Sequence, residues 1–351
     1  MALSPQQRSQ LLQTKLRALI VEHWNVDPDV LVAHPFPAGA AFVAATTGIG
    51  WVLVAEVKVN ADPADGHAPG PSLPAGWLGG AVVWRARHGL ATLNVLADRN
   101  DPDGARRNEL LAAPLALFAV KGRAIAAMTA APFEMPAAPD AVTMLLADTI
   151  TECGADAVVE HGVLRGEVLG LEVARVTLDD DGVPGLEVGV GRHDRLAQSM
   201  MHGVGSGGDL TVGLREAVAA VLAHRAPDRG LHPANQLSRE RWLREILCRK
   251  PSIIGCADLA PVSSTVEPKL KLASPAVAVG TRADGSAVAV GCTIGVDLDA
   301  SLVTVDSAPE GANCILVIPD GDDVPAVRLV AAALRRPVAV VTVPRLWMGL
   351  G

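Results

Sequence analysis

The chain has 351 residues, of which 50% are hydrophobic and 19% are charged, so it is long enough for two or three units that each bury a core. Its net charge of −8 argues against a protein that coats nucleic acid through overall charge, although a local basic patch could still bind phosphates.

Five cysteines form no Cys-x-x-Cys pair and mostly lie in apolar runs, which is typical of buried thiols in a reducing compartment. The first residues lack the basic-then-apolar layout of a signal peptide, and no apolar run reaches the roughly 18 residues of a membrane span. We therefore expect a cytoplasmic protein without a membrane partner.

The first third of the chain reads as an alternation of strands and helices. Ser4 and Pro5 begin a capped helix over residues 6–23, whose leucines share one stripe. A β-hairpin follows, and residues 60–76 form a Pro- and Gly-rich loop. The expected elements are strands 40–45 and 51–57, helix 77–88, strand 91–97, helix 105–113 and strand 115–120.

The end of the chain repeats this plan. We expect a hairpin of strands 277–279 and 287–294, strand 314–318, helix 324–335 and strand 338–343. Asp98 precedes a helix that leads to Pro114 and an apolar strand, and Asp320 and Pro337 frame the same arrangement. This matched spacing predicts a duplicated β-β-α-β-α-β unit.

The middle segment begins after the Pro-rich linker 132–139. A helix over 140–152 precedes three strands, 163–168, 171–177 and 186–190, and helices follow over 210–225 and 236–249. Residues 251–274 are expected to be a linker. The predicted class is therefore α/β or α+β with mixed sheets, in units 1–130, 131–255 and 256–351.

The central strands lead into a turn that could bind an anion. Asp194 is expected to cap a short helix, so that Arg192 and His193 face the ligand beside free backbone N–H groups. The glycine-rich segment that follows is either a flexible connector or a phosphate cradle, although it lacks the Lys-Ser/Thr ending of a P-loop. The glycines concerned are Gly203, Gly205 and Gly207.

Histidines and carboxylates gather in the same segment and suit zinc or iron as ligands. No histidine pair has the spacing of helical metal ligands, so surface histidines are the alternative interpretation. The residues are His161, His193, His202, His232, Glu160, Glu187 and Asp194.

One basic region stands out in this acidic protein. Helix 236–249 carries Arg239, Arg241, Arg244 and Arg249, either as a solvated face paired with nearby glutamates or as a contact surface for phosphates.

Glu56-Val57-Lys58 ends the second strand of the first hairpin, and Pro28-Asp29 lies upstream. Through these residues the chain resembles the restriction-endonuclease-like, PD-(D/E)xK, nuclease family over about 100 residues per copy. The resemblance implies Mg²⁺ held near Glu56 and Lys58. Asp29 lies before the first strand, and the second copy has Gly291-Cys292-Thr293 in place of Glu-x-Lys, which implies an inactive second copy. An ordinary exposed strand end is the alternative.

The sequence favours one function and leaves two alternatives open. The favoured function is a nucleic-acid-associated protein with a nuclease-like, degenerate fold that contacts phosphates through the Arg-rich helix. The second is a non-enzymatic scaffold whose duplicated units bind a protein partner or each other. The third is a small-molecule or nucleotide-binding enzyme that uses the central turn, which requires its histidines and carboxylates to converge.

Overall fold

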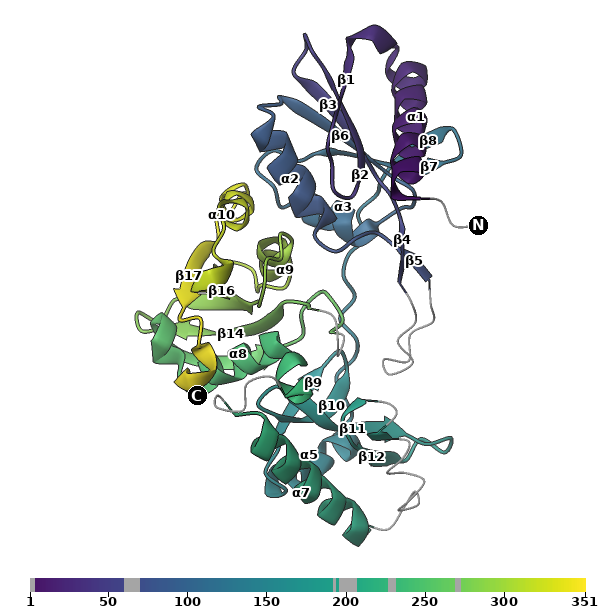
Figure 1. Ribbon diagram of the computed structural model, residues 1–351. Helices are drawn as coiled ribbons and strands as arrows, with labels where there is room; N and C mark the ends of the chain where they lie inside the picture. The colour runs from purple at the N-terminus through teal and green to yellow at the C-terminus, as the bar shows by residue number, and fades with distance from the viewer. Residues whose placement is uncertain (1–3, 60–69, 192–193, 196–206, 227–231, 269–272) are drawn as a thin grey trace.

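The computed structural model describes residues 4–59, 70–191, 194–195, 207–226, 232–268 and 273–351. Three main sheets lie in three tiers along the long axis of the molecule (Figure 1). The N-terminal and C-terminal units lie next to each other, and the central unit packs on the far side of the C-terminal one. The class is mixed α/β, as the sequence predicts.

The N-terminal unit begins with α1 (Pro5–Trp24), which Ser4 and Gln7 start with reciprocal side-chain to backbone bonds. Its six-stranded sheet has the order β1-β2-β3-β6-β7-β8, in which β3, β6 and β7 run parallel and the other neighbours antiparallel. The strands are β1 (Leu31–His34), β2 (Gly39–Ala44), β3 (Ile49–Val54), β6 (Thr92–Ala97), β7 (Ala116–Lys121) and β8 (Ala124–Ala127). A separate ribbon pairs β4 (Val57–Val59) with β5 (Gly70–Ser72).

Helices cover both faces of this sheet. Leu16, Leu19 and Ile20 of α1 bury one face together with Phe42 and Trp51. Two crossover helices, α2 (Trp77–Arg87) and α3 (Pro102–Asn108), cover the other face. They connect parallel strands. A tight turn can join only antiparallel strands, so parallel neighbours need a longer crossover such as a helix.

The C-terminal unit repeats this topology. Its sheet has the order β13-β14-β15-β16-β17, with the first two pairs antiparallel and the last two parallel. The elements are α8 (Arg239–Arg249), β13 (Cys256–Val262), β14 (Ala276–Arg282), β15 (Ala287–Cys292), α9 (Ala300–Asp306), β16 (Asn313–Pro319), α10 (Pro325–Ala332) and β17 (Ala339–Val343). The predicted duplication is confirmed, and each copy is larger than expected.

In the two main repeat sheets and the helices that cover them, three strands and one helix have no counterpart among the sequence predictions. β1 and β13 add a strand before each hairpin, and β13 lies in a segment expected to be a linker. β8 adds a strand after β7, and α9 fills the crossover of the second copy. β13 contains Asp258 and Pro261, which suit an edge strand and weaken the strand signal.

The two repeats pack through equivalent surfaces. Their crossover helices form one hydrophobic core that lies between the first and third sheets. Leu111 follows α3 and Leu334 follows α10, and the two residues form an antiparallel bridge. The Ala112 N–H donates to Ala333 O and the Arg335 N–H to Leu110 O, each at 2.9 Å.

Polar contacts complete this interface. Arg106 of α3 binds both carboxylate oxygens of Asp306 at 2.9 Å. The Gly79 N–H of α2 donates to Asp299 Oδ1 at 2.7 Å, just before α9. The repeats therefore form an internal dimer with near-twofold character.

The central unit is an antiparallel sheet of order β12-β11-β10-β9 backed by helices. Its elements are α4 (Ala141–Met144), α5 (Leu146–Glu152), β9 (Asp156–Glu160), β10 (Val163–Val168), β11 (Leu171–Leu178), β12 (Pro184–Val188) and α7 (Gly207–His224). An irregular stretch over 128–140 connects it to the N-terminal unit, as the Pro-rich linker predicts (Figure 1).

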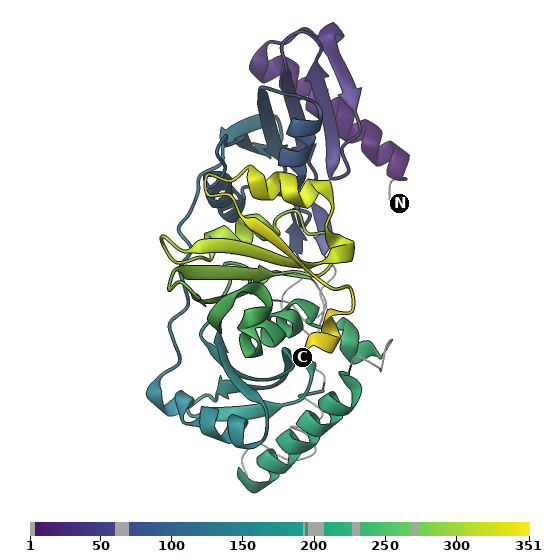
Figure 2. The same ribbon diagram turned by 90° about the vertical axis from the view of Figure 1, so that its left-hand side faces the viewer.

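Helix α8 lies between the central and C-terminal sheets (Figure 2). Trp242, Leu243, Ile246 and Leu247 bury one side of it against the third sheet. By packing, therefore, the C-terminal unit begins at α8 and not at residue 256, because α8 has the place that α1 has in the first copy.

Candidate functional site

Two of the four arginines of α8, Arg241 and Arg244, converge on one site, and they point into the protein. Arg241 and Arg244 are 7% and 2% exposed. Both guanidinium groups bind Glu160, at the end of β9, and both lie 3.3–3.4 Å from Glu167 of β10. This burial corrects the expected basic face, because neither side chain is available to phosphates.

The ion-pair network continues across the central sheet. Glu172 of β11 lies 3.4 Å from Arg165, 2.9 Å from Arg175 and 3.0 Å from Arg195. Although burial raises the pKa of Glu160, the charges of Arg244 and Arg241 lower it to about 2, so this carboxylate stays ionised.

For Glu167, burial dominates and raises the pKa, partly offset by Arg241 and Arg244. The network fixes α8 on the central sheet, and every charge in it faces an opposite charge.

Arg239 and Arg249 complete the predicted basic set. Arg239 is half-buried. Arg249 is exposed and is paired with Glu245 of its own helix and, at 2.8 Å, with Asp156. Arg249 therefore fits the alternative interpretation, a solvated helix face whose arginines pair with nearby glutamates.

Most of the central turn lies outside the described residues, including Arg192, His193, Gly203 and Gly205. Gly207 is the first described residue of α7. Asp194 accepts a hydrogen bond from the Val190 N–H at 2.7 Å, which closes the turn behind it.

Those of the expected metal ligands that the structure describes do not come together in one cluster. Glu160 is taken by two arginines, and Glu187 lies 3.5 Å from Arg195. His232 stacks on His224 with ring centroids 4.1 Å apart. Within the described parts of the chain, no group of three histidine, cysteine or carboxylate side chains could hold a metal ion. His193 and His202 lie outside those parts.

The residues of the nuclease resemblance do not share a strand of the first sheet. β3 ends at Val54, Glu56 lies in the link that follows, and Lys58 belongs to β4 of the separate ribbon. The Glu56 carbonyl accepts a hydrogen bond from Arg8 at 2.7 Å. Asp29 lies in a single 3-10 turn, Pro28–Val30, before β1.

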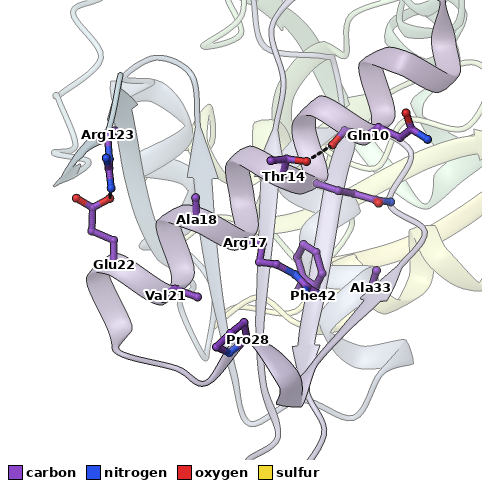
Figure 3. Close-up of a pocket in the computed structure, with 11 residues that line it drawn as sticks. Gln10, Thr14, Arg17, Ala18, Val21, Glu22, Pro28, Ala33, Phe42 and Arg123 are labelled. Carbon is purple, nitrogen blue, oxygen red and sulfur yellow. Dashed lines mark hydrogen bonds and ion pairs between the residues drawn. The ribbon is translucent and has the colours of Figure 1, made fainter.

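An open groove of about 1030 Å³ lies along α1 (Figure 3). One wall is the outer side of α1, and the floor comes from β1 and β2 through Ala33 and Phe42. Pro28 also lines the groove, as does the ion pair between Glu22 and Arg123 at 2.8 Å. The side chains that line it are Gln10, Gln13, Thr14, Arg17, Ala18, Val21, Glu22, Pro28, Ala33, Phe42 and Arg123.

Arg17 lies in the middle of the groove. Its guanidinium carbon is 5.3 Å from the centroid of the Phe42 ring, and it makes only a long, 3.5 Å contact to the Leu31 carbonyl. Among the described residues no carboxylate pairs with Arg17. A guanidinium group that lies near an aromatic ring and is open to solvent can form a bidentate pair with a carboxylate.

The groove has an equivalent in the second copy. The most deeply buried pattern of α1, Leu16-x-x-Leu19-Ile20, matches Leu243-x-x-Ile246-Leu247 of α8. Aligning these patterns places Arg17 at the position of Arg244 and Thr14 at that of Arg241.

In the second copy that side of the helix is occupied. The central sheet packs against it, with Glu160 at the end of β9 bound by Arg241 and Arg244. The β10–β11 turn also lies against the helix, since a Cβ on Gly170 would be 2.4 Å from the Arg241 carbonyl carbon. The residue after Glu160, His161, donates its backbone N–H to Ser263 Oγ, just after β13, at 2.8 Å. The same side is therefore filled in one copy and open in the other.

Sequence reasoning missed this groove because its lining residues come from five separate segments with no shared motif. The repeat itself was the available signal, since aligning α1 with α8 pairs Arg17 with Arg244. No protein-family model matches the chain, and neither a curated protein nor a solved structure matches it.

Proposed function

We propose that the protein is a non-enzymatic scaffold that binds a protein partner in the groove along α1. The observation that supports this most is a comparison of the two repeats. The equivalent side of α8 holds a β-hairpin whose glutamate is bound by arginine, and Arg17 takes the place of one of those arginines.

The occupant of the second copy indicates the chemistry of the partner. It combines a carboxylate at a hairpin turn with apolar strand residues, here Glu160 between Val159 and the β10 strand. The groove offers a matching cation in Arg17 and apolar contacts in Val21, Ala33 and Phe42. We therefore propose a partner that presents an acidic hairpin, in the reducing cytoplasm, where the five free cysteines would persist.

Nucleic-acid association stays a prediction, as does the nuclease resemblance with its Mg²⁺. Burial of Arg241 and Arg244 removes two of the four arginines on which that prediction depends. The described part of the chain contains no helix long and apolar enough to cross a membrane.

The test uses the protein's own hairpin as a probe. A fluorescently labelled, cyclised peptide with the sequence of residues 156–167 is titrated with the full chain, and its anisotropy is followed. We expect binding that weakens at least tenfold when Arg17 is changed to Glu, because one charge-assisted pair becomes a repulsion.

The matched controls are a Glu160→Gln peptide and the chain variant Arg87→Glu, which alters an exposed arginine away from the groove. We expect the Glu160→Gln peptide to lose binding to the wild-type chain, and the Arg87→Glu chain to bind the unchanged peptide normally. Binding that ignores both Arg17 and Glu160 would contradict the proposal, and a labelled single-stranded DNA in the same assay tests the nucleic-acid alternative.

A further inference from the structure

The central sheet has a second hairpin turn, between β11 and β12, at the same end as the β9–β10 turn. Successive antiparallel strands make alternate turns fall at one end of a sheet, and the order β12-β11-β10-β9 places both there. Glu160, beside the β9–β10 turn, is bound by Arg241 and Arg244 of α8. The β11–β12 turn is exposed, with Leu178 and Val183 61% and 57% accessible to solvent.

This second turn is acidic and has a fixed shape. Asp179 Oδ1 accepts hydrogen bonds from the N–H groups of Asp181 and Val183, at 3.0 and 2.8 Å. Asp179 is therefore used to hold the turn, while Asp180 and Asp181 are exposed beside the two apolar side chains. The turn thus combines free carboxylates with exposed apolar groups, which are the two features that the α1 groove complements.

We infer that the β11–β12 turn of one molecule docks in the α1 groove of a second copy of this chain. This inference rests on the proposed function, since it names the hairpin that the groove binds. Asp180 and Asp181 meet Arg17, and Leu178 and Val183 pack on Val21 and Phe42. Glu22 is the acidic residue of the groove, and its pairing with Arg123 offsets its charge.

Docking within one molecule is excluded by distance, because α1 and the β11–β12 hairpin lie at opposite ends of the molecule (Figure 1). The contact therefore joins the top of one copy to the bottom of the next. Such a head-to-tail contact uses two different surfaces, so it continues into rings or filaments instead of stopping at a symmetric dimer.

The experiment measures assembly of the full chain by sedimentation velocity over a range of concentrations. We expect the wild type to form a ladder of species that shrinks when salt is raised, because exposed charges contribute to the contact. Arg17→Glu disables the groove, and the double variant Asp180→Lys with Asp181→Lys disables the turn. Each variant alone should be a monomer. Both changes are at exposed positions and leave Asp179 in place.

Mixing the two variants gives the decisive result. The groove variant still has its turn and the turn variant still has its groove, so together they should form one contact and a 1:1 complex of twice the single-chain mass. A wild type that stays monomeric, or assembly that both variants retain, overturns the inference. If the peptide of residues 156–167 binds through Arg17 while the chain stays monomeric, this inference fails and the proposed function stands.

Discussion

Leu111 and Leu334 occupy the same position in the two repeats, three residues before Pro114 and Pro337, and they pair with each other. A residue that contacts its own equivalent lies on the symmetry axis of an isologous interface. Both leucines are almost fully buried, at 1% and 2% exposure. The two repeats are therefore joined as the subunits of a twofold dimer are.

The two leucines should contribute similarly to stability. We expect Leu111→Ala and Leu334→Ala each to lower the free energy of unfolding by about 2–5 kcal/mol, the usual cost of a buried leucine truncation. Denaturant unfolding measures both, and Leu346→Ala, at an 80% exposed site, is the control. A cost at only one of the two positions would show that the axis does not lie between them.

Adjacent glycines in α2 should respond to alanine with opposite signs. A Cβ on Gly79 would lie 2.3 Å from the Leu298 carbonyl oxygen of the other repeat, whereas a Cβ on Gly80 meets nothing within 4 Å. We expect Gly80→Ala to stabilise by about 0.4–1 kcal/mol, because the unfolded chain loses freedom. Gly79→Ala should destabilise by about 1–3 kcal/mol through overpacking.

Thermal melts of the two glycine variants decide the point. Stabilisation by both would mean that the repeats approach each other less closely than the contact between Gly79 and Asp299 implies.

Asp299 should make the repeat interface sensitive to pH. Burial, followed by the charge of Asp297, raises the pKa of Asp299 from 3.8 to about 7. Between these values the folded protein keeps a proton that the unfolded chain releases, so stability falls as pH rises through this window. We expect Asp299→Asn to flatten the pH dependence of unfolding and to raise stability above pH 7.

Urea unfolding at several pH values measures this effect, with Glu310→Gln at an exposed site as the control. Stability of the Asp299→Asn variant that falls with pH as steeply as that of the wild type would refute it.

The buried network should be costly to break. Arg244→Met leaves Glu160 and Glu167 with one guanidinium fewer, and removal of one partner of a buried pair costs about 3–5 kcal/mol. Arg249→Ala, at an exposed ion pair on the same helix, should cost about 1 kcal/mol or less. Denaturant unfolding compares the two, and equal costs would contradict the structural role of the network.

Much of the fold follows from local patterns in the sequence. The Asp-to-Pro spacing predicted the duplication because it marks a strand end, a crossover helix and the next strand, which are all local features. Ser4 and the leucine stripe predicted α1 for the same reason. β1 was missed because it has only four residues, and β13 because Asp258 and Pro261 interrupt its apolar signal.

The site depends on contacts between segments distant in the sequence. The sequence suggested that Arg241 and Arg244 form a basic surface, because their partner Glu160 lies 81 residues before Arg241 and 84 residues before Arg244. The alternation of charge in α8 fits a solvated helix equally well. Only the docking of the central sheet on α8 distinguishes the two, and no local pattern encodes it.

Fusion of the two repeats has a consequence for how many ligands the molecule can hold. The β9–β10 hairpin is tethered close to α8, so its local concentration exceeds that of any free competitor. Under the proposed function, the chain's own hairpin fills the second copy, and a module that is twofold in architecture would have a binding valence of one.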